Sequence, residues 1–161
     1  MRPARTIIGV MGPNDCLPEQ AETAARLGRL IAEAGYTLLC GGRGGVMEAA
    51  ARGAQEAGGL TIGVLPGHDA AESPPNPYIE IPIFTGLSHA RNLINVLTAQ
   101  VVVAVGGAYG TLSEIALAHK CGKPVILLDS WEYHPAEPLL AALARIADTP
   151  EDALALIEDF L

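Results

Sequence analysis

The chain has 161 residues, a net charge of −8 and a hydrophobic fraction of 50%. This length fits one domain, 1–161, and the apolar content excludes a disordered chain. The ten basic residues are scattered along an acidic chain, so we expect no nucleic acid as a partner. The first apolar run, residues 7–11, is too short for a signal peptide or a membrane span, which indicates a cytoplasmic protein with no membrane partner.

Short apolar runs alternate with helical patterns along the chain. The predicted strands cover residues 7–10, 36–40, 60–65, 79–84, 100–105 and 124–128. The predicted helices cover residues 18–34, 46–57, 89–98, 111–121 and 136–146, and a last helix opens at Thr149-Pro150. This alternation predicts an α/β fold, a Rossmann-like doubly wound and mostly parallel sheet with helices on both faces.

Two of these strands have a predicted place in the sheet. Residues 101–105 are apolar without alternation, as in the middle of a parallel sheet. Pro82 cannot donate to a strand ladder, so residues 79–84 belong at an edge. Ligands of such sheets bind at the carboxyl ends of the strands, where the strand order reverses, so candidate binding residues are sought there.

Two glycine-rich turns each follow a predicted strand and precede a predicted helix. The candidate binding residues of the first turn are Gly41, Gly42, Arg43, Gly44 and Gly45. Those of the second turn are Gly106, Gly107, Tyr109, Gly110 and Thr111. Glycine lets the backbone approach an anion closely, and the helix that follows presents free N–H groups. The turns therefore predict a site for a small phosphorylated ligand, although neither has the Walker or the dinucleotide-fold spacing.

The sequence of the two turns resembles the Lonely Guy (LOG) family, once labelled as lysine decarboxylases. Residues 41–47 look like its first signature. The second family signature reads Pro-Gly-Gly-x-Gly-Thr-x-x-Glu, and Gly107, Gly110, Thr111 and Glu114 match it. Arg91 matches an arginine that the family carries upstream. The resemblance covers roughly residues 6–130.

The resemblance implies a Rossmann-like homodimer that hydrolyses the N-glycosidic bond of nucleoside 5′-monophosphates. Arg91 and Glu114 would be the catalytic pair, and the second turn would hold the phosphate. The chemistry fits these residue types, because a carboxylate stabilises the oxocarbenium-like charge that develops when the bond breaks, and an arginine anchors phosphate. Structural roles stay open for both, with Glu114 as a helix cap and Arg91 on a helix surface.

Some positions depart from the LOG pattern. Asn92 stands where active LOG enzymes commonly have lysine, and Gly106 stands for the proline of the second signature. These features resemble a sister branch that includes the molybdenum-cofactor carrier proteins. Three functions therefore remain open: a phosphoribohydrolase, a non-catalytic carrier of a ligand such as a pterin phosphate, and a nucleotide sensor.

Pyridoxal chemistry is excluded by the placement of the lysines. Lys120 and Lys123 flank a helix-to-strand turn and neither follows a strand, so no residue is placed to form the Schiff base. The three cysteines lack metal-ligand spacing. We expect no bound metal and no resident cofactor.

Two further segments have open interpretations. Asp129 and Trp131 follow a strand end and are candidates for lining the ligand. The apolar segment 93–97 either faces a second copy of the chain or packs on its own sheet. His68 and Asp69, in a proline-rich loop, are predicted to face solvent.

Overall fold

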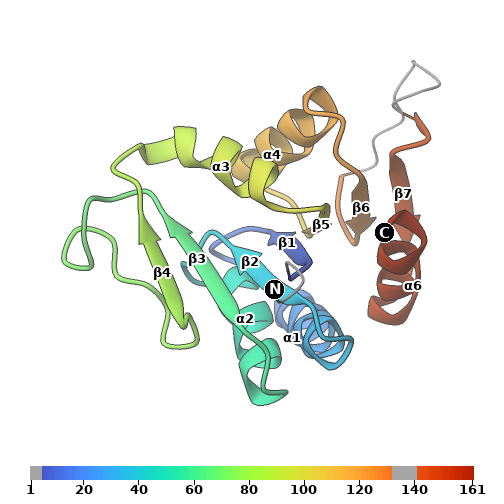
Figure 1. Cartoon of the computed structure of the whole chain (residues 1–161), viewed down its shortest axis with the longest axis horizontal. Helices are drawn as coiled ribbons and strands as arrows, with labels where there is room; N and C mark the ends of the chain where they lie inside the picture. The colour runs from blue at the N-terminus through green and yellow to red at the C-terminus, as the bar shows by residue number, and fades with distance from the viewer. Residues whose placement is uncertain (1–4, 132–140) are drawn as a thin grey trace.

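A computed structural model describes residues 5–131 and 141–161 of the chain. Its strands form one parallel sheet in the order β4-β3-β2-β1-β5-β6-β7 (Figure 1). The strands are β1 (Ile7–Met11), β2 (Thr37–Cys40), β3 (Thr61–Leu65), β4 (Ile81–Phe84), β5 (Val101–Val105), β6 (Val125–Leu128) and β7 (Ala144–Ala147). The sheet confirms the predicted Rossmann-like, doubly wound α/β fold.

Helices cover both faces of the sheet. One face carries α1 (Pro18–Glu33), α2 (Val46–Glu56) and α6 (Pro150–Phe160), and the other carries α3 (Arg91–Thr98) and α4 (Tyr109–Lys120) (Figure 1). A single 3₁₀ turn, η1 (Ser88–Ala90), leads into α3. Within the described residues, no helix has the length and apolar character needed to cross a bilayer.

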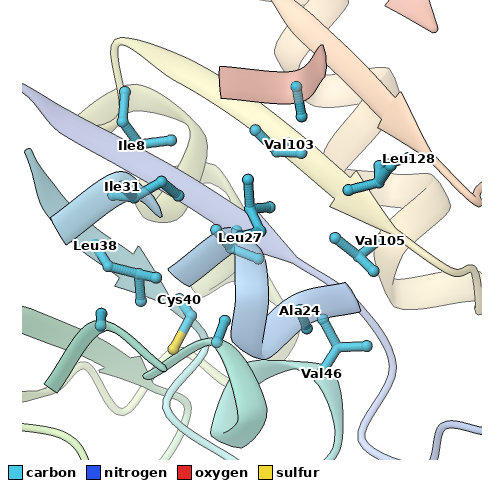
Figure 2. Packing of buried hydrophobic residues seen from close by; sticks show 14 of the residues in the cluster. Ile8, Ala24, Leu27, Ile31, Leu38, Cys40, Val46, Val103, Val105 and Leu128 are labelled. Atoms are coloured by element: carbon cyan, nitrogen blue, oxygen red, sulfur yellow. The ribbon is translucent and has the colours of Figure 1, made fainter. Parts of the chain in front are cut away.

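The larger of two apolar cores lies between the sheet and helices α1, α2 and α6. Figure 2 shows Ile8 and Val103 of the sheet close to Leu27 and Ile31 of α1, and all four are fully buried. Gly28 of α1 has no room for a side chain, because a Cβ there would collide with the backbone of α2. Small residues thus let two helices pack closely over a sheet that contains few aromatic side chains.

Both predicted strand placements are confirmed. β5 lies inside the sheet and is buried along its whole length, whereas β4, with Pro82, forms an edge. The predicted start of the last helix is also confirmed, because the Thr149 side chain accepts a hydrogen bond from the Asp152 amide at 3.1 Å.

The predicted helix over 136–146 is wrong at its C-terminal end. Residues 136–140 lie outside the described residues, and residues 144–147 form β7, which pairs with β6. Alanine, leucine and arginine favour helix locally. The edge of β6 offers backbone hydrogen bonds instead, and Val125 donates to the Leu143 carbonyl at 2.7 Å. Strand pairing therefore overrides the local propensity.

The strand order reverses between β1 and β5. β1 pairs with β2 on one side and with β5 on the other, so the loops that leave β1 and β5 diverge to opposite faces. In open parallel sheets this divergence leaves a crevice beyond the carboxyl ends of the strands. The loops after Met11, Cys40, Leu65 and Val105 gather there.

Candidate functional site

A cavity of about 400 Å³ opens at this point of the sheet. It brings together parts of both glycine-rich turns with the first turns of α3 and α4. The wall residues with most bearing on its chemistry are Gly41, Arg43, Arg91, Gly110, Thr111 and Glu114. Its volume lies in the range of small-molecule sites.

The N-terminus of α4 is open toward this cavity. The N-cap residue, Ala108, has no side chain that could cap the helix. Throughout residues 5–131 and 141–161, no acceptor meets the amides of Tyr109, Gly110 and Thr111. The Thr111 hydroxyl is buried and also lacks a partner there. A helix start with free donors and the positive end of the helix dipole is an arrangement that binds anions.

The first glycine-rich turn is built differently. Gly44 donates its amide to Asn14 Oδ1 at 3.0 Å, and Val46 donates to the Pro13 carbonyl at 3.1 Å. Gly42 donates to Cys40 Sγ at 3.4 Å. These contacts use the amides of Gly42 and Gly44 within the protein, and the residues of this turn that line the cavity are Gly41 and Arg43.

Two guanidinium groups border the cavity. Arg91 is partly buried, and its Nη1 atom has no hydrogen-bond partner among the described residues. Burial lowers the pKa of Arg91, the Glu114 carboxylate raises it, and the positive charge of Arg43 lowers it. Two positive charges in the wall of one cavity favour the binding of an anion there. A Cβ at Gly41 would displace the Arg91 guanidinium, so the lack of a side chain there leaves room for this group.

Glu114 is buried in the wall of the cavity, with 6% of its surface exposed. Burial raises the pKa of Glu114 to about 7, against the opposing effects of a hydrogen bond from Asn95 and the charge of Arg91. Asn95 Nδ2 donates to Glu114 Oε1 at 2.8 Å. None of the ion pairs in the described part of the chain joins Arg91 to Glu114. Asn95, rather than Arg91, orients this carboxyl group.

Several predicted binding residues lie outside the cavity. Gly42 faces the Leu65 side chain of β3. Gly45 faces backbone atoms of the loop after β1, and Gly44 lines an adjoining hollow. Gly106 packs against Gln20, and Gly107 packs against the indole of Trp131. Tyr109 points into solvent with 86% exposure. Its free backbone amide, and not its side chain, belongs to the helix start described above.

The other candidates from the sequence also have defined places. Asp129 and Trp131 line a separate cavity of about 320 Å³ at the ends of β6 and β7. His68 and Asp69 are exposed, as predicted. Among the described residues, no group of three or more His, Cys, Asp or Glu side chains could hold a metal ion.

The sequence interpretation missed Asn14 and Asn95 as residues of the site. A signal existed for Asn95, which is a polar residue inside the apolar segment 93–97 and lies four positions after Arg91, on the same helix face. Asn14 has no such local signal, because its contact with Gly44 joins residues 30 positions apart.

The fold and the site define a Rossmann-like α/β domain with a polar cavity at the reversal of strand order. A family model described as SLOG cluster4 matches residues 5–154, and the chain belongs to this family. The cytokinin riboside 5′-monophosphate phosphoribohydrolase of Mycobacterium tuberculosis is 31% identical over 81% of this chain and 73% of its own length. This relative confirms the kinship with LOG-type proteins.

Two solved structures resemble the chain along nearly its whole length. The molybdenum cofactor binding protein from Rippkaea orientalis is 44% identical with a TM-score of 0.86, and 97% of each chain is covered. The molybdenum cofactor carrier protein from Chlamydomonas reinhardtii is 42% identical with a TM-score of 0.87, and 98% of each chain is covered. Both the hydrolase and the carrier interpretations thus have support at the level of the family.

Proposed function

We propose that this protein binds a phosphorylated pterin, the molybdenum cofactor, and carries it without turnover. The observation that carries the proposal is the open start of α4, where the free amides of Gly110 and Thr111, the Thr111 hydroxyl, unpartnered among the described residues, and the Arg91 guanidinium border one cavity. The phosphate of the ligand lies at this helix start, where both the dipole and the arginine favour negative charge.

Similarity to carrier proteins supports the pterin part of the proposal. The two carrier structures match at 42–44% identity over nearly the whole of each chain, and the phosphoribohydrolase at 31% over a smaller share. The position of Asn92 supports the absence of turnover. Asn92 donates to Ser113 Oγ at 2.8 Å, and Ser113 donates to the Gly110 carbonyl at 2.7 Å. A neutral hydrogen-bonded chain thus takes the place of the lysine seen in active LOG enzymes.

A second candidate function is hydrolysis of a nucleoside 5′-monophosphate, and the state of Glu114 favours it. A buried carboxyl group whose pKa is about 7 is close to half ionised at neutral pH, so a carboxylate is available beside the cavity. In this mechanism Glu114 stabilises the oxocarbenium-like charge on the ribose, and Arg91 anchors the phosphate.

One experiment separates the two functions. The protein is produced in cells that make molybdenum cofactor, and its molybdenum and its oxidised, fluorescent pterin are quantified after purification. In parallel, the protein is incubated with AMP, and free adenine and ribose 5-phosphate are measured. Stoichiometric pterin without release of adenine supports the carrier. Release of adenine that is lost in Glu114→Gln, with no pterin in the purified protein, would replace the carrier by the hydrolase.

We also propose that two copies of the chain associate through α3. Leu93 and Leu97 are 39% and 54% exposed, whereas Asn95 and Val96 of the same segment are buried against the protein. Exposed leucines that follow each other at helical spacing mark an apolar stripe suited to a partner helix. Light scattering should give the mass of a dimer for wild type, and the mass of a monomer for Leu97→Glu. A monomeric wild type would contradict this proposal.

A further inference from the structure

A second hollow of about 500 Å³ adjoins the cavity at α4. The two share the wall residues Asn14, Arg43, Pro66 and Ser88. Because the walls are shared, a ligand whose phosphate lies at the α4 start can extend past Arg43 into this second hollow. The hollow is formed by the first turn of α2 and by the proline-rich loop that follows β3.

The second hollow is lined mainly by polar groups, with apolar surface from three prolines. Pro66, Pro74 and Pro75 provide apolar surface. Ser73 lines the hollow and is 6% exposed, and no described residue is a hydrogen-bond partner of its hydroxyl. Apolar surface beside several polar groups suits a planar heterocycle, whose faces are apolar and whose edge carries hydrogen-bond donors and acceptors.

Two carboxylates line the second hollow, and only one is free. Glu72 Oε2 accepts hydrogen bonds from the His68 amide at 2.9 Å and is 2.7 Å from His68 Nδ1. Glu48, on the first turn of α2, meets no donor and no cation in residues 5–131 and 141–161. A half-buried carboxylate without a partner, at the wall of a hollow, is able to accept two parallel hydrogen bonds.

We infer that the second hollow holds a 2-amino-4-oxopyrimidine ring, the ring edge that pterins and guanine share, and that Glu48 recognises it. This inference rests on the proposed function, because it assumes that a phosphate lies at α4. The ring presents an N–H and an adjacent amino group in parallel, and a carboxylate accepts both at once. Adenine and hypoxanthine lack this pair of donors, so Glu48 selects against them.

The test compares GMP with IMP, which differ by the 2-amino group alone. AMP and neopterin monophosphate complete the set, and the pterin arm separates a pterin ligand from a guanine nucleotide. Binding is measured by isothermal titration calorimetry for wild type, Glu48→Gln and Glu33→Gln. Glu33→Gln is the matched control, because Glu33 is exposed on α1 and makes the same change of charge.

We expect GMP and neopterin monophosphate to bind wild type about tenfold more tightly than IMP and AMP. A factor of about ten is what one bidentate pair of hydrogen bonds contributes to discrimination between bases. Glu48→Gln removes this preference and leaves the affinity for AMP unchanged, and Glu33→Gln changes nothing. Equal affinities for GMP and IMP, or a preference that survives Glu48→Gln, would overturn the inference alone. Absence of binding by all four ligands would overturn the proposed function together with it.

Discussion

The two glycine-rich turns look alike in sequence, yet they differ in how far their backbone donors are already used within the protein. In the first turn, Gly44 and Val46 donate to Asn14 and Pro13 of the loop after β1. In the second turn, the amides of Tyr109, Gly110 and Thr111 have no acceptor in the part of the chain that the structure describes. The amides of Gly44 and Val46 thus link the first turn to the loop after β1, whereas the amides at the start of α4 are free to donate to a ligand.

A glycine-rich strand-to-helix turn therefore indicates that something approaches the backbone closely, but the sequence does not identify the approaching group. At Gly45 the approaching group is the carbonyl of Pro13, so the glycine serves the fold. At Gly110 a Cβ would meet no described residue within 4 Å apart from its own stretch of helix, and Gly110 lines the cavity.

The largest expected effect comes from substituting a glycine in each turn. Gly45 has φ +61° and ψ −128°, and a Cβ there would collide with backbone oxygen atoms. Gly45→Ala should lower the free energy of unfolding by about 3 kcal/mol or more in urea denaturation. Gly110→Ala should keep or raise stability by up to about 1 kcal/mol, because alanine favours the helix, while its methyl group obstructs the ligand. Equal losses of stability would contradict the contrast.

Glu114, at the second turn, should make stability depend on pH. Its pKa is raised from 4.5 to about 7 by burial, so the folded protein binds more protons than the unfolded chain between these values. The contribution of Glu114 to the free energy of unfolding is therefore at its maximum below pH 4.5. It falls by on the order of 3 kcal/mol as the pH rises through about 7. Glu114→Gln, which keeps the acceptor for Asn95, should be the more stable form at pH 8. Identical pH profiles of the two proteins would refute the burial of an ionisable group here.

A smaller effect is expected from the hydroxyl of Thr111. Thr111→Val removes a donor without a change of shape, and should weaken binding of a phosphorylated ligand about tenfold. Its stability should change little, because the hydroxyl is unpartnered among the described residues. Thr37→Val is the matched control. Thr37 Oγ1 is likewise buried and unpartnered among the described residues, but Thr37 is the first residue of β2, at the end of the strand away from the cavity. A control that weakens binding as much as Thr111→Val would argue against a specific contact.

The smallest effect is expected at Asn14. Asn14→Ala breaks the hydrogen bond to the Gly44 amide and should cost about 1 kcal/mol of unfolding free energy, because water partly replaces the lost acceptor. Asn14→Asp keeps an acceptor oxygen and should stay close to wild type. Thermal unfolding of the three proteins measures the difference. If Asn14→Asp lost as much stability as Asn14→Ala, the hydrogen bond from the Gly44 amide to residue 14 would not be what stabilises the first turn.

The fold could be predicted from the sequence because its periodic signals are local. The apolar run of β5 and the proline of β4 each carry enough information to place a strand. β7 could not be predicted, because residues 144–147 have helical propensity and become a strand only through pairing with β6. For a four-residue strand, the pairing partner decides the conformation.

The site could be predicted in part. Arg91, Glu114, Gly110 and Thr111 line one cavity, and their part in binding or catalysis stays a prediction. Which amides are free could not be predicted, since that depends on Asn14 and Pro13, which reach the first turn from another loop. Asn95 had a local signal as a polar residue in the apolar segment 93–97, but its contact with Glu114 depends on the packing of α3 against α4.

The most direct test of the account is an NMR titration of the protein with inorganic phosphate, followed through its backbone amide signals. The account predicts that the amides of Tyr109, Gly110 and Thr111 shift as they begin to donate to the anion, while those of Gly42 and Gly44 stay in place. Signals at the start of α4 that remain unchanged at saturating phosphate, or shifts confined to the first turn, would contradict it.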